Sequence, residues 1–131
     1  MKIYLDIGHG GGDTGAAANG FLEKDLTLKF GLYVRDSLVR AGQTVKCSRE
    51  SDVNNFGTTA SDAIIGSANL ANEWRADFFL SIHFNASSND KSGGAQFIYS
   101  HEDEKGKALC EMIADEYQKA GQPLNAIFTR V

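Results

Sequence analysis

The sequence has little of what defines several large classes of protein. Its 131 residues include two cysteines, one proline and one tryptophan, and its apolar runs are only a few residues long. A membrane-spanning helix needs about 20 consecutive apolar residues, so we expect no membrane span. The polar residue Asp6 follows the first five residues before an apolar core can develop, so we also expect no signal peptide.

Charge and cysteine content exclude further classes of protein. The net charge is −4 and no stripe of Lys or Arg is present, so a nucleic-acid partner is not expected. Cys47 and Cys110 form neither a zinc-binding motif nor a disulfide framework. We expect both to be buried as small apolar residues, with a single bridge as the alternative. The length suits one domain, over residues 1–131, with its own core.

Alternating strand and helix patterns predict an α/β fold with a mostly parallel sheet flanked by helices. The expected strands are 2–7, 44–48, 78–84 and 95–100, and the expected helices are 25–40, 61–75 and 109–120. The order is therefore β-α-β-α-β-β-α. The strand at 78–84 is almost continuously apolar, which is typical of a strand covered by helices on both faces. No element is expected over 122–131.

Three side chains are expected to meet at one edge of this sheet. His9 follows the first strand, His83 lies at the end of the third, and Glu23 leads into the first helix. The carboxyl ends of parallel strands lie at the same edge, where α/β proteins bind their ligands. Two imidazoles and one carboxylate, with a fourth position left for water, are the ligand set of a catalytic zinc site.

The residues around these three suit such a site. Asp6, Asp13 and Asn85 carry short polar groups that could orient a ligand imidazole or contact substrate. The glycines on both sides of His9 allow a sharp turn. His83 interrupts an apolar strand, and a metal would supply the partner that a buried polar group needs.

Each of these features also has an ordinary structural interpretation. A glycine-rich loop after a first strand begins many phosphate and dinucleotide sites, but the G-x-G-x-x-G order and the P-loop lysine are missing here. A lone buried histidine such as His83 is usually satisfied within the core. Glu23 suits the positive end of a helix dipole without any metal. His101, beside acidic residues, is expected in a solvated loop.

Three segments, taken in order, resemble the motifs of the zinc-dependent N-acetylmuramoyl-L-alanine amidases of the type 3 family. They are residues 6–16 (DIGHGGGDTGA), 23–28 (EKDLTL) and 71–86, which ends in SIHFNA. The resemblance implies that His9, Glu23 and His83 bind one Zn²⁺. It also implies hydrolysis of the amide between N-acetylmuramic acid and L-alanine in bacterial peptidoglycan.

The sequence departs from this family in two places. The family's general-base glutamate lies in a late strand, before Gly-Phe, and no such segment occurs in residues 1–131, so no catalytic base is assigned. Ser67 stands near where the family commonly has arginine. We expect a domain that lacks the last strand and helix of the family fold. There are two alternatives. The chain is a natural short form, or it borrows a carboxylate from residues 102–104 or from a neighbouring subunit. The unpaired sheet edge would favour self-association.

The function expected from this resemblance is a peptidoglycan hydrolase of the autolysin or endolysin type, acting at the cell wall outside the membrane. Two alternatives stay open at this point. One is a zinc-containing module that binds the cell wall without catalysis, which the missing base would favour. The other is a zinc peptidase on a similar fold.

Overall fold

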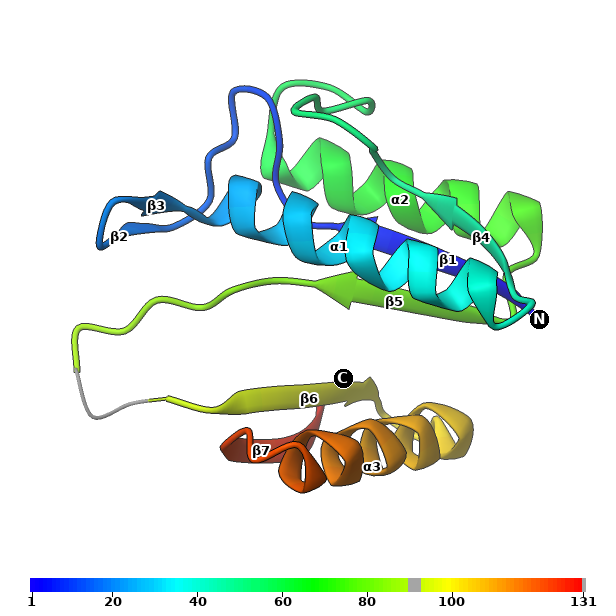
Figure 1. Cartoon of the computed structure of the whole chain (residues 1–131). Coiled ribbons are helices and arrows are strands. Elements are labelled where there is room, and N and C mark those ends of the chain that lie inside the picture. The colour runs from blue at the N-terminus through cyan, green and yellow to red at the C-terminus, as the bar shows by residue number, and fades with distance from the viewer. Residues whose placement is uncertain (90–92, 131) are drawn as a thin grey trace. The chain divides into compact units, whose positions relative to one another are not determined.

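The computed structural model describes residues 1–89 and 93–130, which form two compact units, Met1–Ala86 and Ser87–Val131 (Figure 1). The first unit contains β1 (Lys2–Ile7), β2 (Ala17–Ala18), β3 (Phe21–Leu22), α1 (Glu23–Arg40), β4 (Thr44–Cys47), α2 (Ala60–Trp74) and β5 (Phe78–Ile82). The second contains β6 (Ala95–Ser100), α3 (Glu104–Lys119) and β7 (Leu124–Arg130). The predicted α/β class is confirmed. The prediction of one domain over the whole chain stays a prediction.

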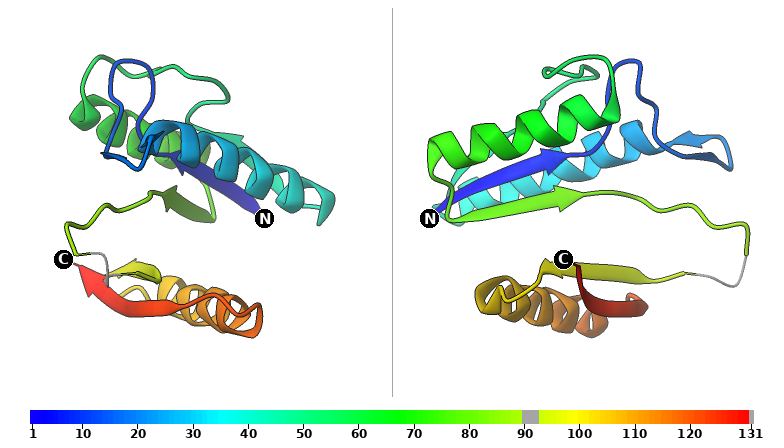
Figure 2. Two further views of the ribbon diagram at one scale, coloured as in Figure 1. Left: turned by 60° about the vertical axis from the view of Figure 1, so that its left-hand side comes forward. Right: turned by 180° about the vertical axis from the view of Figure 1, so that it is seen from behind.

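The first unit is built on a parallel sheet in the order β4-β1-β5. The central strand β1 is buried from Ile3 to Ile7, because it has a neighbour on each side and a helix over each face. Figure 2 shows α1 and α2 on opposite faces of this sheet. Gly31 of α1 lies directly against Ile7, whereas Ser67 of α2 bonds to Asp6. Successive residues of β1 therefore face different helices, as the pleat of a strand requires.

A short hairpin, β2–β3, leads from the glycine-rich loop into α1, and the predicted element order lacks it. Its turn is Asn19-Gly20, and both residues have positive φ, 51° and 80°. Asn-Gly is the dipeptide that favours such a turn, so the signal is present in the sequence. The hairpin places Glu23 at the first position of α1, two residues before the predicted start.

The second unit is a strand, a helix and a second strand parallel to the first. The expectation that residues 122–131 form no element is wrong, because β7 pairs with β6 along most of its length. Its side chains alternate between half-buried and exposed from Leu124 to Phe128. The side chain of Asp103 caps the start of α3 by accepting from the Gly106 amide.

Two expectations about burial are also corrected. In β5, half-buried and exposed residues alternate and Phe79 is 43% exposed, so this strand is less buried than β1. Cys47 and Cys110 are half-buried free thiols in different units, not fully buried residues. Burial raises the pKa of the Cys47 thiol to about 11, so this thiol stays protonated at neutral pH.

Candidate metal centre

The two histidines lie at the same edge of the sheet because β1 and β5 are parallel neighbours. The Gly8 amide donates to the Ile82 carbonyl at 3.1 Å, which joins the residue after β1 to the last residue of β5. His9 and His83 come next along the chain. A Cβ atom at Gly8 would lie 2.5 Å from the His83 ring, so only glycine allows this imidazole to lie where it does. His83 follows the strand instead of lying within it, which corrects the predicted boundary.

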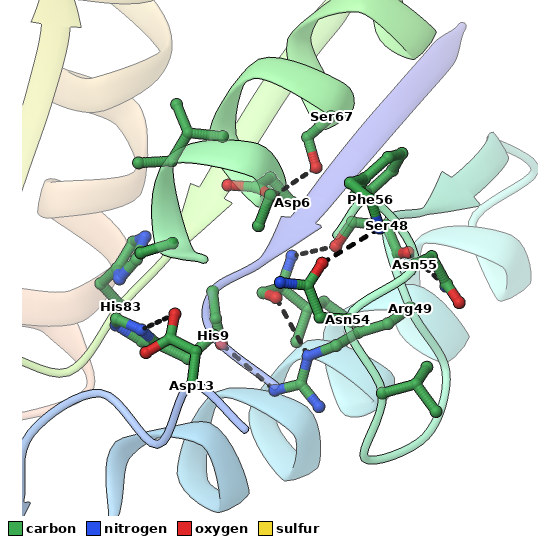
Figure 3. Close-up of a pocket in the computed structure, with 16 residues that line it drawn as sticks. Asp6, His9, Asp13, Ser48, Arg49, Asn54, Asn55, Phe56, Ser67 and His83 are labelled. Atoms are coloured by element: carbon green, nitrogen blue, oxygen red, sulfur yellow. Dashed lines mark hydrogen bonds and ion pairs between the residues drawn. The ribbon is translucent and has the colours of Figure 1, made fainter. Parts of the chain in front are cut away.

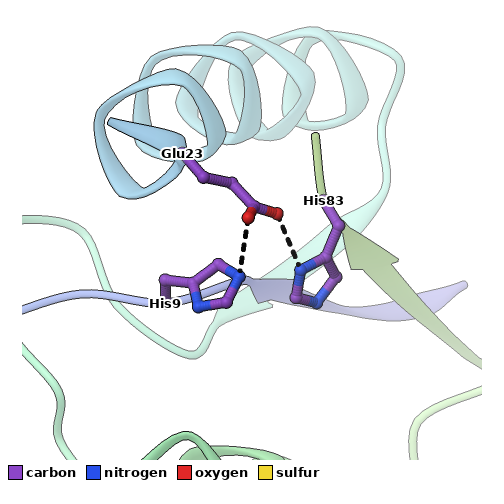
Figure 4. Close-up of side chains that lie close together, drawn as sticks. All are labelled: His9, Glu23 and His83. Carbon is purple, nitrogen blue, oxygen red and sulfur yellow. Dashed lines mark hydrogen bonds and ion pairs between the residues drawn. The ribbon is translucent and has the colours of Figure 1, made fainter. Parts of the chain in front are cut away.

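Glu23 extends from the first turn of α1 and contacts both imidazoles (Figure 4). Its Oε2 lies 3.1 Å from His9 Nε2, and its Oε1 lies 3.2 Å from His83 Nδ1. The two rings meet edge to face, with their centroids 5.0 Å apart. One donor atom from each of the three residues lies within 4.8 Å of the other two. The structure thus brings together the three residues that the sequence analysis proposed as ligands.

The surroundings of Glu23 keep its carboxylate ionised. Burial alone would raise its pKa, but the Ala16 and Phe84 amides each donate to it at 3.0 Å. Together with the neighbouring imidazoles, these donors lower the pKa of Glu23 below its ordinary value. The carboxylate is therefore negative at neutral pH, as a metal ligand must be.

The three residues proposed as supporting groups have different environments. Asp13 Oδ2 lies 2.9 Å from His9 Nδ1, so His9 presents its other nitrogen, Nε2, to Glu23. A carboxylate on the far nitrogen of an imidazole is the usual support of a metal-binding histidine. Asp6 is not brought to an imidazole, because its two oxygens accept from the hydroxyls of Ser67 and Ser81 at 2.8 and 2.7 Å. Asn85 lies in the loop that follows His83.

Ser67 has a clear packing role in this chain (Figure 3). Its side chain is fully buried and donates to Asp6 across the face of β1. Beside it lies a cavity of about 30 Å³, lined by Asp6, Arg49 and His83 among others, which is enough for one or two water molecules. A short hydroxyl at this position thus satisfies the buried carboxylate at close range.

Arg49 is a functional candidate that the sequence analysis missed. It is 3% exposed, and its guanidinium donates to backbone carbonyls on both sides of the site. Burial lowers the pKa of Arg49, and nearby carboxylates oppose that effect. In the sequence, Arg49 lies in a polar stretch with no periodicity, so no local pattern marks it.

The donor set of His9, Glu23 and His83 fits a divalent ion of the zinc type. Zinc binds imidazole nitrogen and carboxylate oxygen at about 2.0–2.2 Å in a tetrahedral arrangement, which separates neighbouring donors by about 3.3 Å. The Glu23 oxygens lie 3.1 Å from His9 and 3.2 Å from His83, one oxygen to each ring, and one donor atom from each of the three residues lies within 4.8 Å of the other two. The His83 side chain is 40% exposed, so the cluster is open to solvent on one side.

Comparisons with known proteins show the family to which the chain belongs. Residues 3–129 match the family described as N-acetylmuramoyl-L-alanine amidase. The chain is 44% identical over 101 residues to the N-acetylmuramoyl-L-alanine amidase CwlM of Bacillus licheniformis, across 76% of this chain and 36% of that protein. It is 35% identical over 124 residues to the germination-specific N-acetylmuramoyl-L-alanine amidase of Bacillus subtilis, across 89% of this chain and 52% of that protein.

A solved structure matches the fold over nearly the whole chain. The CwlD amidase from Clostridioides difficile, solved in complex with the GerS lipoprotein, superposes with a TM-score of 0.84 at 28% identity. The match covers 98% of this chain and 72% of that one. The chain spans about a third to a half of the length of the two curated relatives above. No helix in the described part of the chain is long and apolar enough to cross a membrane.

Proposed function

We propose that this chain, which belongs to the N-acetylmuramoyl-L-alanine amidase family, binds one Zn²⁺ through His9, Glu23 and His83. We also propose that it hydrolyses the amide between N-acetylmuramic acid and L-alanine. The observation that carries the proposal is the convergence of these three donors at the carboxyl ends of β1 and β5. A buried, ionised carboxylate between two imidazoles is suited to a dication.

Each residue of the cluster has a separate task in this proposal. Glu23 supplies negative charge, and the Ala16 and Phe84 amides fix the direction of its oxygens. Asp13 holds His9 with Nε2 toward the cluster. A zinc ion bound there would polarise the amide carbonyl and lower the pKa of a bound water from about 15.7 to about 7. The proton transfers of the reaction are not assigned to these residues.

The open side of the cluster is where the substrate would bind. The exposure of His83 leaves access for a polymeric substrate that cannot enter a closed cavity. The relatives are named as N-acetylmuramoyl-L-alanine amidases, so we assign this chain peptidoglycan as substrate and the cell wall as its place of action. The net charge of −4 fits this assignment, which requires no nucleic-acid partner.

The test is zinc-dependent release of new L-alanine amino termini from purified peptidoglycan. We expect release by the parent chain and by His101→Ala, which changes an exposed histidine in the second unit. We expect no release by His9→Ala. Absence of release by the parent, with retained binding to peptidoglycan, would contradict catalysis and favour a binding module. New termini other than L-alanine would indicate a peptidase instead.

A further inference from the structure

Arg49 connects the two turns that carry the neighbouring donors of the cluster. Its Nε donates to the Ile7 carbonyl at 3.1 Å, and its Nη2 donates to the Gly8 carbonyl at 3.1 Å. The same Nη2 donates to the Lys24 carbonyl at 2.7 Å. Gly8 immediately precedes His9, and Lys24 immediately follows Glu23. One guanidinium therefore bridges the backbone beside two proposed metal ligands.

Thr27 makes the same connection from within α1. Its hydroxyl donates to the Gly8 carbonyl at 2.7 Å and lies 3.1 Å from the Lys24 carbonyl. It also accepts from Arg49 Nη2 at 3.0 Å. Thr27 is fully buried, so these bonds do not compete with solvent.

Asp52 completes the connection on the other side of His9. Its Oδ1 accepts from the Gly11 amide at 2.9 Å, and its Oδ2 pairs with Lys24 Nζ at 2.7 Å. Lys24 Nζ also donates to the Gly11 carbonyl at 2.9 Å. The segment from Arg49 to Asp52 thus holds the chain before His9, the chain after His9 and the first turn of α1.

The backbone around His9 needs such support. His9 has φ 64°, a left-handed conformation that is unfavourable for a residue with a side chain. Conformations of this kind persist only where the surroundings enforce them. Gly10 lies so close to Arg49 that a Cβ atom there would be 2.9 Å from Arg49 Cδ and 2.3 Å from the Val53 carbonyl oxygen. The 49–53 segment and the His9 turn are therefore fitted to one another.

We infer that Arg49, assisted by Asp52, is a positioning residue that sets the separation of His9 and Glu23 and thereby the affinity of the cluster for zinc. The inference rests on the proposed function, in which these residues bind the metal. A buried guanidinium is stable only if its donors are satisfied. Here Nη1 donates to the Ser51 carbonyl, and Nε and Nη2 donate to carbonyls of the two turns that must be held together.

The test compares zinc affinity with thermal stability in Arg49→Ala, Arg49→Lys and a control. Zinc affinity is measured by competition with a chromophoric chelator, well below the melting temperature of every variant. The Co²⁺ absorption spectrum reports the ligand geometry. We expect Arg49→Ala to bind zinc about 10–100-fold more weakly, as removal of a group that supports metal ligands usually does. Arg49→Lys should recover part of this loss, because an ammonium cannot bridge all three carbonyls.

Trp74→Ala is the control, because the Trp74 ring contacts the ammonium groups of Lys2 and Lys46, and Lys2 begins β1 at the end away from His9. It should lower the melting temperature and leave zinc affinity within about twofold of the parent. If Arg49→Ala and Arg49→Lys matched this control in both zinc affinity and the Co²⁺ spectrum, Arg49 would be a structural residue only and the inference would be overturned.

Two further variants keep the outcome clear. If Arg49→Ala does not fold, Asp52→Asn replaces it, with an expected loss of severalfold in zinc affinity. His9→Ala separates the two proposals, because unchanged zinc binding in that variant would refute the metal site itself. Loss of zinc in His9→Ala with parent-like binding in Arg49→Lys and Asp52→Asn would refute only the positioning role.

Discussion

The chain contains two versions of the same local architecture, a strand followed by a helix and a parallel neighbouring strand. In the first unit it is β1–α1–β4, and in the second it is β6–α3–β7. The first version has a strand buried along five of its six residues, whereas Ala114 is the only buried residue among those described in the second unit. The candidate metal centre lies entirely in the first unit, with His9 and Glu23 from β1–α1 and His83 from the end of β5.

The difference comes from what surrounds each strand. β1 has β5 on its second edge and α2 over its second face, so even its polar residue Asp6 is buried and satisfied by serine hydroxyls. Enclosure of this kind fixes the strand end, and with it the turn that carries His9. A strand-helix-strand unit thus supplies a sheet edge on which a site can form. Packing by further elements, here β5 and α2, holds the side chains at that edge in place.

The largest effect should come from removing a donor of the first unit. We expect His9→Ala and His83→Ala each to weaken zinc binding more than about 100-fold, beyond the loss usual for groups that only support ligands. The measurement is zinc stoichiometry by elemental analysis after dialysis. His101→Ala, in the second unit, is the matched control and should retain zinc like the parent. Retention of zinc by both site variants would show that the metal site is assigned incorrectly.

The next effect tests burial in the two units directly. Leu5→Ala removes a fully buried side chain of β1 and should lower the free energy of unfolding by about 3 kcal/mol. Leu109→Ala removes the same side chain from a half-buried position of α3 and should cost about 1 kcal/mol. Urea unfolding followed by circular dichroism measures both. Equal losses would mean that the second unit has a core as complete as the first.

The cysteines provide a pH test with one thiol in each unit. Burial raises the pKa of Cys47 from 9.0 to about 11, a change of two units that reduces its thiolate fraction at pH 8 about 100-fold. Burial raises the pKa of Cys110 as well. We expect alkylation of Cys47 by iodoacetamide to be very slow at pH 8 and to accelerate up to about pH 11. Peptide mass spectrometry distinguishes the two sites.

The same shift has a consequence for stability. Below about pH 8.5 the Cys47 thiol is largely protonated in the folded and unfolded chains, so its contribution to the free energy of unfolding is fully present. As pH rises toward about 11 the unfolded thiol ionises first, and this contribution is lost. Cys47→Ser should flatten this alkaline decline. A decline as steep in Cys47→Ser as in the parent would contradict the assignment.

The smallest losses of stability should come from removing helix caps, and they should be similar in the two units. Thr59 begins α2 with a capping box, and Asp103 caps α3. Replacing either residue by alanine should lower the free energy of unfolding by about 1 kcal/mol, because a cap acts locally whatever its tertiary surroundings. Chemical denaturation of the two variants tests this. A much larger loss in only one of them would show that its cap also supports tertiary contacts.

Much of the fold could be predicted because its elements carry regular patterns. The strands at 2–7 and 95–100 have the predicted bounds. The three helices overlap their expected positions, but α3 begins at Glu104, five residues before its predicted start. β7 was missed because Ile127 interrupts the apolar alternation that begins at Leu124, so the segment shows no clear period. Its partner β6 stabilises it through pairing, which a local pattern does not reveal.

The candidate site, like the fold, could be predicted from the sequence only in part. His9 and His83 were predicted to meet because parallel strands end at one edge, and the structure brings them together with Glu23. The bonds of Asp6 to Ser67 and Ser81 could not be predicted, because its position beside the His9 loop does not reveal which face of β1 it occupies. Arg49 was missed because its acceptors beside His9 and in α1, three carbonyls and the Thr27 hydroxyl, lie 22 to 42 residues away along the chain.

The sequence alone determined which residues could form strands and helices, and that the three donors would be carried to one edge of a parallel sheet. These are consequences of periodicity and of strand direction, which act over short stretches of chain. Only the tertiary structure decided that Glu23 lies between the two imidazoles and that Arg49 bonds to the backbone beside His9 and Glu23. Such distances are set by the packing of α1, α2 and the 49–53 segment around β1, and packing joins residues that no local pattern relates.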